Sequence, residues 1–303
     1  MTGTGGDVRG GPASSLSVGR LAEIACILEV SARKPGNVHP GASFRDLHHL
    51  DFLLSAGAIA GPLDEARHRG VGRSILAATE ATRRVVRTNT NLGIILLLAP
   101  LAAVPAEVGL AEGIESVLAA TTVEDARAAY RAIRLAMPGG LGRAAEQDVA
   151  DEPTATLREV MSLAADRDLI ARQYADGFRE VLSEAAPMLS QAVRGGSPLE
   201  PAIVGTFLGL LARHEDTLIV RKAGRQVAAE ASRKAGAVLE AGGVGTAAGR
   251  ERLAELDAWL RAEGSLRNPG ATADLVTAAL FAALRDGTIP LPRDPGPAGW
   301  SGD

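Results

Sequence analysis

Cysteine, aromatic residues and lysine are all scarce in this chain. The single cysteine among 303 residues excludes both a disulfide framework and a zinc site built from cysteines. Aromatic residues, which strands favour, make up only 3% of the sequence. Cys26 lies among apolar residues at a helical position, so we expect a buried and unreactive thiol.

No segment has the length and hydrophobicity of a membrane span. The longest apolar run, residues 92–104, is shorter than the roughly 20 residues that a bilayer requires, and it predicts a buried core helix instead. Residues 1–17 are rich in Gly and Ser and lack the apolar segment of a secretion signal. The net charge of -4 indicates no basic surface for nucleic acid. We therefore expect a cytoplasmic protein with neither membrane nor nucleic-acid partners.

Helix-forming residues dominate what the chain does contain. Hydrophobic residues make up 46% of the sequence and are mostly Ala, Leu and Val; Ala and Leu are strong helix formers. Apolar residues recur at helical spacing in residues 21–28, 170–182 and 276–284, whereas the period-two alternation of strands never persists. The pattern predicts an all-α fold.

We expect this fold to be one bundle-like catalytic domain of about ten helices over residues 16–287. A chain of this length can form a single large helical domain with a sizeable core. The two ends, residues 1–15 and 288–303, are rich in Gly, Pro and Asp, and we expect them to be disordered tails.

Lysine and asparagine are rare enough for their positions to be informative. An arginine-rich chain that keeps a lysine can need a compact ammonium group there. Asparagine favours turns and helix caps, so a single one needs no function. Two of the lysines nevertheless fall in the same polar segments as the asparagines, or in similar ones, which indicates a shared polar site. The lysines are Lys34, Lys222 and Lys234, and the asparagines are Asn37, Asn89, Asn91 and Asn268.

The first polar segment, residues 29–40, gathers an acid, a hydroxyl, two cations, an amide and an imidazole around a Pro-Gly turn. Such a loop can present Lys34 and backbone N–H groups to phosphate oxygens, or it can simply end a helix. Downstream, Asp46 and Asp51 flank a predicted helix start. Their carboxylates could hold Mg²⁺, although Asp46 alone also suits a helix cap.

Three further polar segments lie at predicted helix ends. Residues 88–93 place four small polar residues before the apolar helix, where free N–H groups and the helix dipole favour an anion. Residues 214–224 set two acids beside two bases, which fits either a metal–phosphate site or a solvated salt-bridge cluster. Residues 268–274 form a turn that leads into a helix with an acid in its first turn, a position that also suits the helix dipole.

Several sharper motifs are absent from the sequence. It has no Walker loop, no dinucleotide-binding glycine fingerprint and no zincin histidine pair. It also lacks the serine elbow of the α/β-hydrolases. The four polar segments therefore carry the functional prediction.

In this order, the four segments resemble the triphosphoribosyl-dephospho-CoA synthase family. The family's Ser-x-x-Lys-Pro-Gly segment is matched by residues 31–36, and its Asn-Thr segment by residues 89–90. Its acid-plus-Arg segment looks like Asp216 with Arg221, and its late Pro-Gly-x-x-Ala-Asp matches residues 269–274. An Asp and Phe-Ser pattern is matched loosely by Asp46, Asp51, Phe52 and Ser55.

The resemblance implies an enzyme that moves the triphosphoribosyl group of ATP to the 2′-hydroxyl of 3′-dephospho-CoA and releases adenine. ATP is then a substrate and Mg²⁺ an expected companion. The reaction passes through an oxocarbenium-like state, so it needs a triphosphate clamp, negative charge near the cation and a base for the hydroxyl.

The resemblance also suggests roles for individual residues. We assign the triphosphate to Lys34, Arg221 and Lys222. Asp46, Asp51 and Asp216 are candidates for Mg²⁺, for the base or for electrostatic support. Asp274 is a candidate for contact with the ribose or adenine, and Glu29 for orienting Lys34. The remaining predicted substrate-binding residues are Ser31, Gly36, Asn37, Asn89, Thr90, Asn91 and Asn268.

One departure from the family pattern keeps alternatives open. Asn91-Leu92-Gly93 stands where the family has His-Lys-Gly, so an imidazole and a cation are missing. A diverged branch serving another cofactor pathway, for example one-carbon cofactor biosynthesis, is one alternative. A non-enzymatic helical binding protein is the other, and it predicts that the polar segments are scattered. Ala-rich helices can also pack between subunits, so we expect a possible homodimer.

Overall fold

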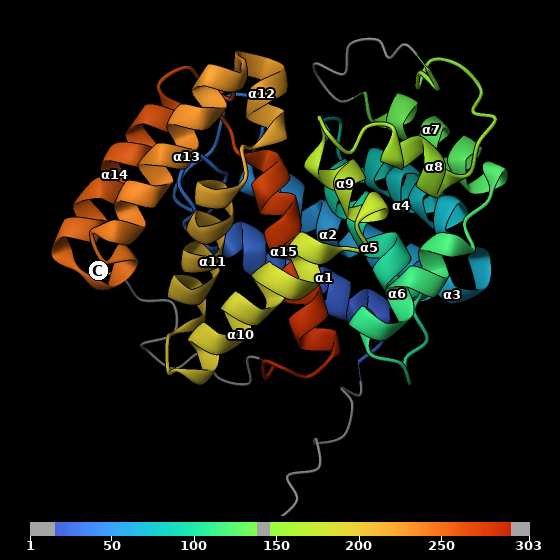
Figure 1. The fold of residues 1–303 in the computed structure, drawn as a ribbon, viewed down its shortest axis with the longest axis horizontal. Coiled ribbons are helices and arrows are strands. Elements are labelled where there is room, and N and C mark those ends of the chain that lie inside the picture. The colour runs from blue at the N-terminus through green and yellow to red at the C-terminus, as the bar shows by residue number, and fades with distance from the viewer. Residues whose placement is uncertain (1–15, 138–145, 292–303) are drawn as a thin grey trace, which may run out of the picture.

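The computed structural model describes residues 16–137 and 146–291, and over these ranges the chain is all-α, without a strand (Figure 1). This confirms the predicted fold class. The α-helices are α1 (Val18–Ser31), α2 (His49–Asp64), α3 (Ala66–Arg69), α4 (Val71–Val85), α5 (Leu92–Ala103), α6 (Leu110–Ala119), α7 (Val123–Ala136), α8 (Leu157–Ser162), α9 (Leu169–Ala175), α10 (Ala186–Arg194), α11 (Leu199–Arg213), α12 (Thr217–Ala223), α13 (Arg225–Glu240), α14 (Ala247–Arg261) and α15 (Gly270–Arg285).

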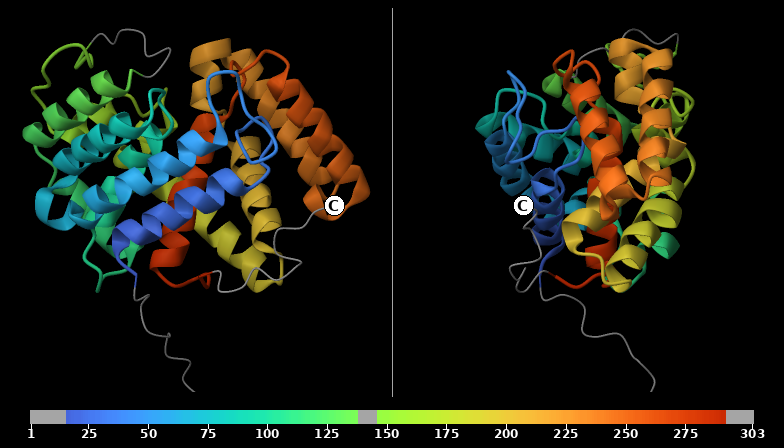
Figure 2. Two further views of the ribbon diagram at one scale, coloured as in Figure 1. Left: turned by 180° about the vertical axis from the view of Figure 1, so that it is seen from behind. Right: turned by 90° about the vertical axis from the view of Figure 1, so that its left-hand side faces the viewer.

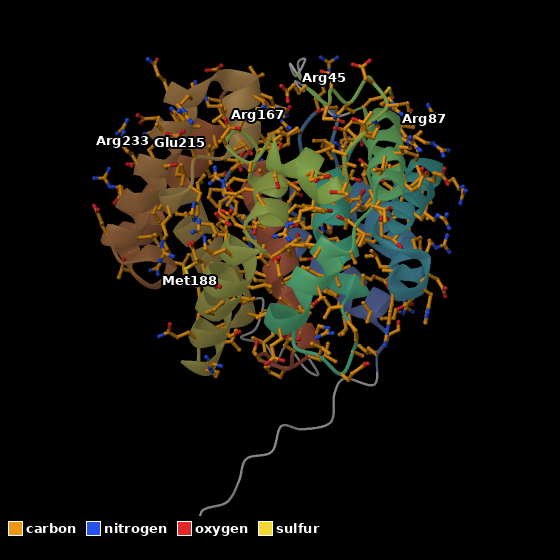
Figure 3. The ribbon with its side chains drawn as sticks, turned by 45° about the vertical axis from the view of Figure 1, so that its right-hand side comes forward. Arg45, Arg87, Arg167, Met188, Glu215 and Arg233 are labelled. Carbon is orange, nitrogen blue, oxygen red and sulfur yellow. The ribbon has the colours of Figure 1, made fainter. Side chains whose placement is uncertain are left out.

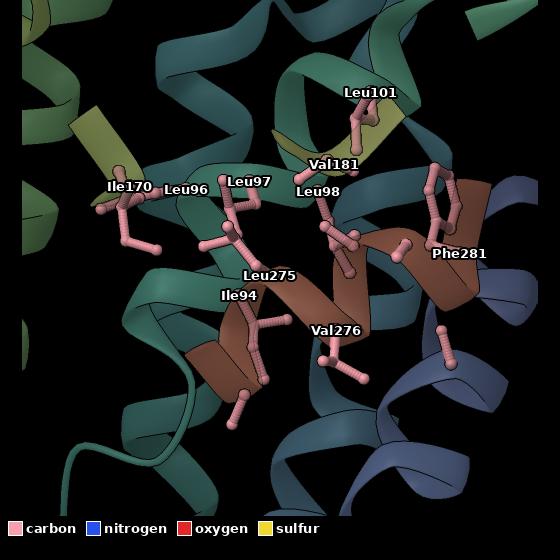
Figure 4. Packing of buried hydrophobic residues seen from close by; sticks show 14 of the residues in the cluster. Ile94, Leu96, Leu97, Leu98, Leu101, Ile170, Val181, Leu275, Val276 and Phe281 are labelled. Carbon is pink, nitrogen blue, oxygen red and sulfur yellow. The ribbon is translucent and has the colours of Figure 1, made fainter. Parts of the chain in front are cut away.

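The helices α5 and α15 form the centre of the molecule. Figure 1 shows α15 running through the middle, with α7, α8 and α9 on one side and α11 to α14 on the other. Ile94, Leu97 and Leu98 of α5 are buried with Leu275 and Val276 of α15 (Figure 4). A helix that is apolar all round belongs in a core, so the prediction for the apolar run is confirmed.

The described ranges contain fifteen α-helices, whereas periodicity predicted about ten. The number is higher because several long apolar patterns are interrupted. The pattern at 170–182 is the clearest case. Helix α9 ends at Ala175, Gly177 and Phe178 have φ of 64° and 61°, and a π-helix follows over Glu180–Ala185. Phe178 is nevertheless fully buried and packs on Tyr174. Apolar spacing therefore reported burial correctly but not the continuity of the backbone.

Two residues just beyond the predicted C-terminal boundary at residue 287 contact the helical core. The Thr288 and Ser190 hydroxyls form a hydrogen bond of 2.8 Å, and Ile289 is buried in the core. Residues 1–15 and 292–303, where we expected tails, lie outside the described ranges. Within residues 16–137 and 146–291, no helix has both the length and the hydrophobicity of a membrane span.

The single cysteine behaves as predicted. Cys26 is unpaired and buried in α1. Burial, followed by the nearby carboxylates of Glu29 and Asp274, raises the pKa of its thiol. A neutral buried thiol is a weak nucleophile, so Cys26 serves as a small core residue.

Candidate functional site

One cavity of about 900 Å³ is lined by residues from all four polar segments. It is bounded by the end of α1, the start of α5, the helices α7 to α9 and α12, and the turn before α15. The predicted site residues that line it are Glu29, Asn37, Asp46, Asn89, Thr90, Asn91, Arg221, Lys222, Asn268 and Asp274. Segments far apart in the chain therefore meet at one place, and the scattering predicted by the non-enzymatic alternative is not found.

Glu29 is a buried carboxylate in the cavity wall, in the last turn of α1. Its Oε1 atom lies 3.0 Å from Nζ of Lys34. Burial raises the pKa of Glu29, and the ion pair with Lys34 opposes that rise. The pair fixes one acidic group at the cavity surface.

Lys34 itself does not reach the cavity. Its side chain has a relative exposure of 0%, and its Nζ donates to the carboxylate and the main-chain oxygen of Glu29 and, at 3.1 Å, to the main-chain oxygen of Ala32. An ammonium group has three protons, so none is left for a phosphate. In this structure Lys34 is tied to the end of α1, contrary to the predicted triphosphate clamp.

Asp274 is the second acidic group in the cavity wall, in the second turn of α15. No residue in the described ranges donates a hydrogen bond to its carboxylate. Burial raises its pKa well above the ordinary value, and the charges of Glu29, Asp216 and Asp168 add to that rise. The surroundings of Asp274 therefore favour its neutral form over its charged form.

The start of α5 comes very close to Asp274. A Cβ atom added at Gly93 would lie 2.0 Å from Oδ2 of Asp274, so any side chain there displaces the carboxylate. The glycine permits this approach because it lacks a side chain. A helix N-terminus and a carboxyl group thus share one end of the cavity.

Asp216 has a structural role. It has a relative exposure of 0% and caps α12, with Oδ1 accepting from N–H of Leu218 and Ile219 at 2.9 and 3.1 Å. Its Oδ2 accepts from N–H and Oγ1 of Thr272 at 2.7 and 2.8 Å. Both oxygens are occupied, and Asp216 does not line the cavity.

The three carboxylates predicted to bind Mg²⁺ do not come together. Asp51 accepts from N–H of His48 at 3.0 Å in the capping box of α2, and Asp216 caps α12. Only Asp46 of the three lines the cavity. In the part of the chain that the structure describes, no cluster of three or more His, Cys, Asp or Glu could hold a metal ion.

The first and last polar segments are joined by a hydrogen-bond network. Nδ2 of Asn268 donates to the main-chain oxygen of Gly36 at 2.7 Å and to Oδ1 of Asn37 at 3.2 Å. N–H of Gly36 donates to Asp257 at 2.7 Å. Figure 2 shows the blue loop after α1 against the orange segment before α15. Asn37 and Asn268 line the cavity, whereas Ser31 and Gly36 lie outside its lining.

The segment before α5 combines capping with exposure to the cavity. Asn89 accepts from N–H of Leu92 at 3.2 Å, which caps the helix. The hydroxyls of Thr90 and Ser55 are 2.6 Å apart, and Nδ2 of Asn91 donates to Thr82 at 3.2 Å. Buried Oγ1 of Thr88, also in the lining, has no hydrogen-bond partner among the described residues. The segment therefore caps α5 and also lines the cavity.

Several cationic side chains line the cavity. Arg221 lies 3.0 Å from Asp168, and Lys222 donates to the main-chain oxygen of Ser265 at 3.2 Å. Burial lowers the pKa of Lys222.

The sequence analysis missed Asp168 and four further cations in the lining. A single arginine carries no signal in an arginine-rich chain. These cations are Arg83, Arg87, Arg134 and Arg167; Arg87 and Arg167 are labelled near the upper end of the molecule in Figure 3.

A family model described as ATP:dephospho-CoA triphosphoribosyl transferase matches residues 15–291. The chain belongs to this family. Membership confirms the resemblance inferred from the four polar segments and places the chain among transferases that use ATP and dephospho-CoA. It also counts against the reading of the chain as a non-enzymatic binding protein.

Individual relatives agree with the family assignment. A relative from Pseudomonas fluorescens, named a probable 2-(5''-triphosphoribosyl)-3'-dephosphocoenzyme-A synthase, is 33% identical over 232 residues, which are 76% of this chain and 71% of that protein. A Pseudomonas aeruginosa relative with the same name is 37% identical over 105 residues, and that match spans 35% of each protein.

A solved structure has the same fold. It is described as a triphosphoribosyl-dephospho-CoA synthase from Archaeoglobus fulgidus, and it is 28% identical with a TM-score of 0.60. The comparison covers 78% of this chain and 99% of the other. The helical architecture is thus shared over nearly the whole of the archaeal protein.

Proposed function

We propose that this chain transfers the triphosphoribosyl group of ATP to the 2′-hydroxyl of 3′-dephospho-CoA and releases adenine. The observation that carries the proposal is the convergence of four distant polar segments on one cavity, in a member of the family with this activity. A cavity of about 900 Å³ is within the size range of small-molecule sites. It has room for a nucleotide and part of an acceptor.

Cations around the cavity suit a pair of polyphosphate substrates. Lys222 and Arg221 approach from α12, and Arg83 and Arg87 from the end of α4. Guanidinium groups bind phosphate oxygens in a bidentate manner, and ammonium groups act as point charges. We assign the triphosphate of ATP and the diphosphate of the acceptor to these groups, in place of Lys34.

Mg²⁺ enters this proposal with ATP and not as a resident ion. The three predicted ligands do not fit a protein-held Mg²⁺. Oδ2 of Asp51 accepts in the capping box of α2, both oxygens of Asp216 are occupied, and only Asp46 of the three lines the cavity. A homodimer also stays a prediction, which light scattering would test.

Leu92 supports a second candidate, the same transfer to a different nucleotide-like acceptor. It lines the cavity at the position where the family motif has a lysine. An apolar side chain there removes a charge that could select one phosphate arrangement. The acceptor, and with it the cofactor pathway, would then differ while the donor chemistry is kept.

Product analysis tests the proposal directly. The protein is incubated with ATP and 3′-dephospho-CoA, adenine is quantified by chromatography, and the adduct is identified by mass spectrometry. We expect adenine and adduct in equal amounts, and only when both substrates are present. Adenine release with another diol acceptor but not with dephospho-CoA would favour the second candidate, and no release with any acceptor would refute the transferase.

A further inference from the structure

We propose that Asp274 and Glu29 divide the two proton transfers of this reaction. Asp274 is the general acid that protonates the departing adenine. Glu29, which Lys34 holds in place, is the general base for the attacking hydroxyl. The inference rests on the proposed function and adds an assignment that the family comparison does not contain.

The geometry supports an acid and a base in one cavity. Glu29 and Asp274 come from α1 and α15, which pack against each other, and both line the same cavity. The charge of Glu29 acts on Asp274 and raises its pKa. Two carboxyl groups with different surroundings are the usual arrangement for displacement at a sugar anomeric carbon.

Their surroundings differ in a way that assigns the roles. Glu29 has an ammonium group 3.0 Å away, which stabilises its charged form. Asp274 has no hydrogen-bond donor among the described residues and is surrounded by the negative charges of Glu29, Asp216 and Asp168. The charge of Arg221 opposes this effect, but its guanidinium group is already paired with Asp168 at 3.0 Å. The first proton taken up by the pair therefore resides on Asp274.

The reaction balances with these two groups. The bond between C1′ of the ATP ribose and N9 of adenine breaks, and its electron pair leaves with the base. Asp274 gives its proton to the adenine, so that neutral adenine departs. The 2′-oxygen of the acceptor forms a bond to C1′, and its proton passes to Glu29. Solvent then returns a proton to Asp274 and takes one from Glu29.

Lys34 is a positioning residue in this scheme. It holds Glu29 through its side chain and the end of α1 through the main-chain oxygens of Glu29 and Ala32. Removing the ammonium group leaves Glu29 buried without its cation, so the pKa of the base should rise. The acid limb of the pH–rate profile should then move to higher pH.

A donor that needs no acid separates the two carboxyls. N7-methyladenosine triphosphate loses a neutral base, so its departure requires no proton. With ATP, we expect Asp274→Asn to lower kcat/KM on the order of 10² to 10⁴-fold, as for loss of a general acid. With the N7-methylated donor, the same variant should stay within about tenfold of the wild type. Glu29→Gln should lose activity with both donors.

The pH–rate profile gives a second readout. With ATP, kcat/KM of the wild type should fall at high pH as Asp274 loses its proton, and at low pH as Glu29 gains one. The N7-methylated donor should remove the high-pH limb. Lys34→Met should shift the low-pH limb upward, and if that variant fails to fold, Glu29→Gln with both donors decides the assignment. Asp286→Asn, at the other end of α15 and outside the cavity lining, is the control.

The outcomes separate this inference from the proposed function. If the wild type releases no adenine from either donor, the proposed function itself fails. If the wild type is active but Asp274→Asn loses equally with both donors, Asp274 is not the general acid. Full activity of Glu29→Gln with the N7-methylated donor would overturn the assignment of the base.

Discussion

Asp216 and Thr272 join two of the polar segments through a pair of buried hydrogen bonds. One carboxylate oxygen accepts from both N–H and Oγ1 of Thr272, at 2.7 and 2.8 Å, while the other caps α12. The residue that sequence reasoning placed at a metal site thus fastens the start of α15 to the start of α12. Since Asp274 and Lys222 stand on these two helices, the pair sets the geometry of the cavity.

Replacing Asp216 with Ala should destabilise the protein strongly. The variant loses a helix cap and leaves two buried donors of Thr272 unpaired, which together cost about 3 kcal/mol. For a domain of this size, that corresponds to a fall in Tm of roughly 5 °C, measured by circular dichroism. A fall below about 2 °C would show that the cap and the link to α15 matter little.

Lys34 should matter for stability as well as for activity. Lys34→Met leaves Glu29 buried and unpaired, which should lower the free energy of unfolding by about 3–5 kcal/mol. In the double variant with Glu29→Gln, no buried charge is left, so part of that loss should be recovered. Urea denaturation of the two single variants and the double variant measures the coupling. Strict additivity would mean that the ion pair seen here is absent in solution.

Gly93 should be required for activity because of its closeness to Asp274. In Gly93→Ala the new Cβ would lie 2.0 Å from Oδ2, so the carboxylate has to move. We expect kcat to fall at least tenfold, on the order of 1.4 kcal/mol. Gly236→Ala is the matched control, because nothing lies within 4 Å of its Cβ inside α13. That control should keep activity and gain up to about 1 kcal/mol of stability.

Lys222 should contribute to ATP binding, and Lys234 should not. Lys222 lines the cavity, whereas Lys234 pairs with Glu230 on α13, outside the lining. A charge-assisted hydrogen bond contributes about 1.5–3 kcal/mol, so Lys222→Gln should raise KM for ATP roughly 10- to 100-fold. Steady-state kinetics of Lys222→Gln and Lys234→Gln make the comparison. Equal KM values for ATP in both variants would show that Lys222 does not contribute to ATP binding.

Some of the candidate site could be predicted from the sequence and some could not. The rarity of asparagine and lysine led to Asn37, Asn268 and Lys222, all of which line the cavity. The same argument predicted a phosphate-binding role for Lys34, which instead forms a buried ion pair. A rare lysine can be required for an ion pair as well as for a ligand. Asp168 carried no signal at all, since its place beside Arg221 depends on how α9 and α12 approach each other.

The sequence by itself determined the helical fold class, the buried helix α5 and the family of the chain. These follow from local spacing of apolar residues and from short ordered motifs, which need no knowledge of how the helices pack. The tertiary structure alone decided which carboxyl groups face the cavity. Burial and pairing depend on how the helices pack against one another. Asp216 accepts hydrogen bonds at a helix cap, Lys34 pairs with Glu29, and Asp274 has no hydrogen-bond partner among the described residues.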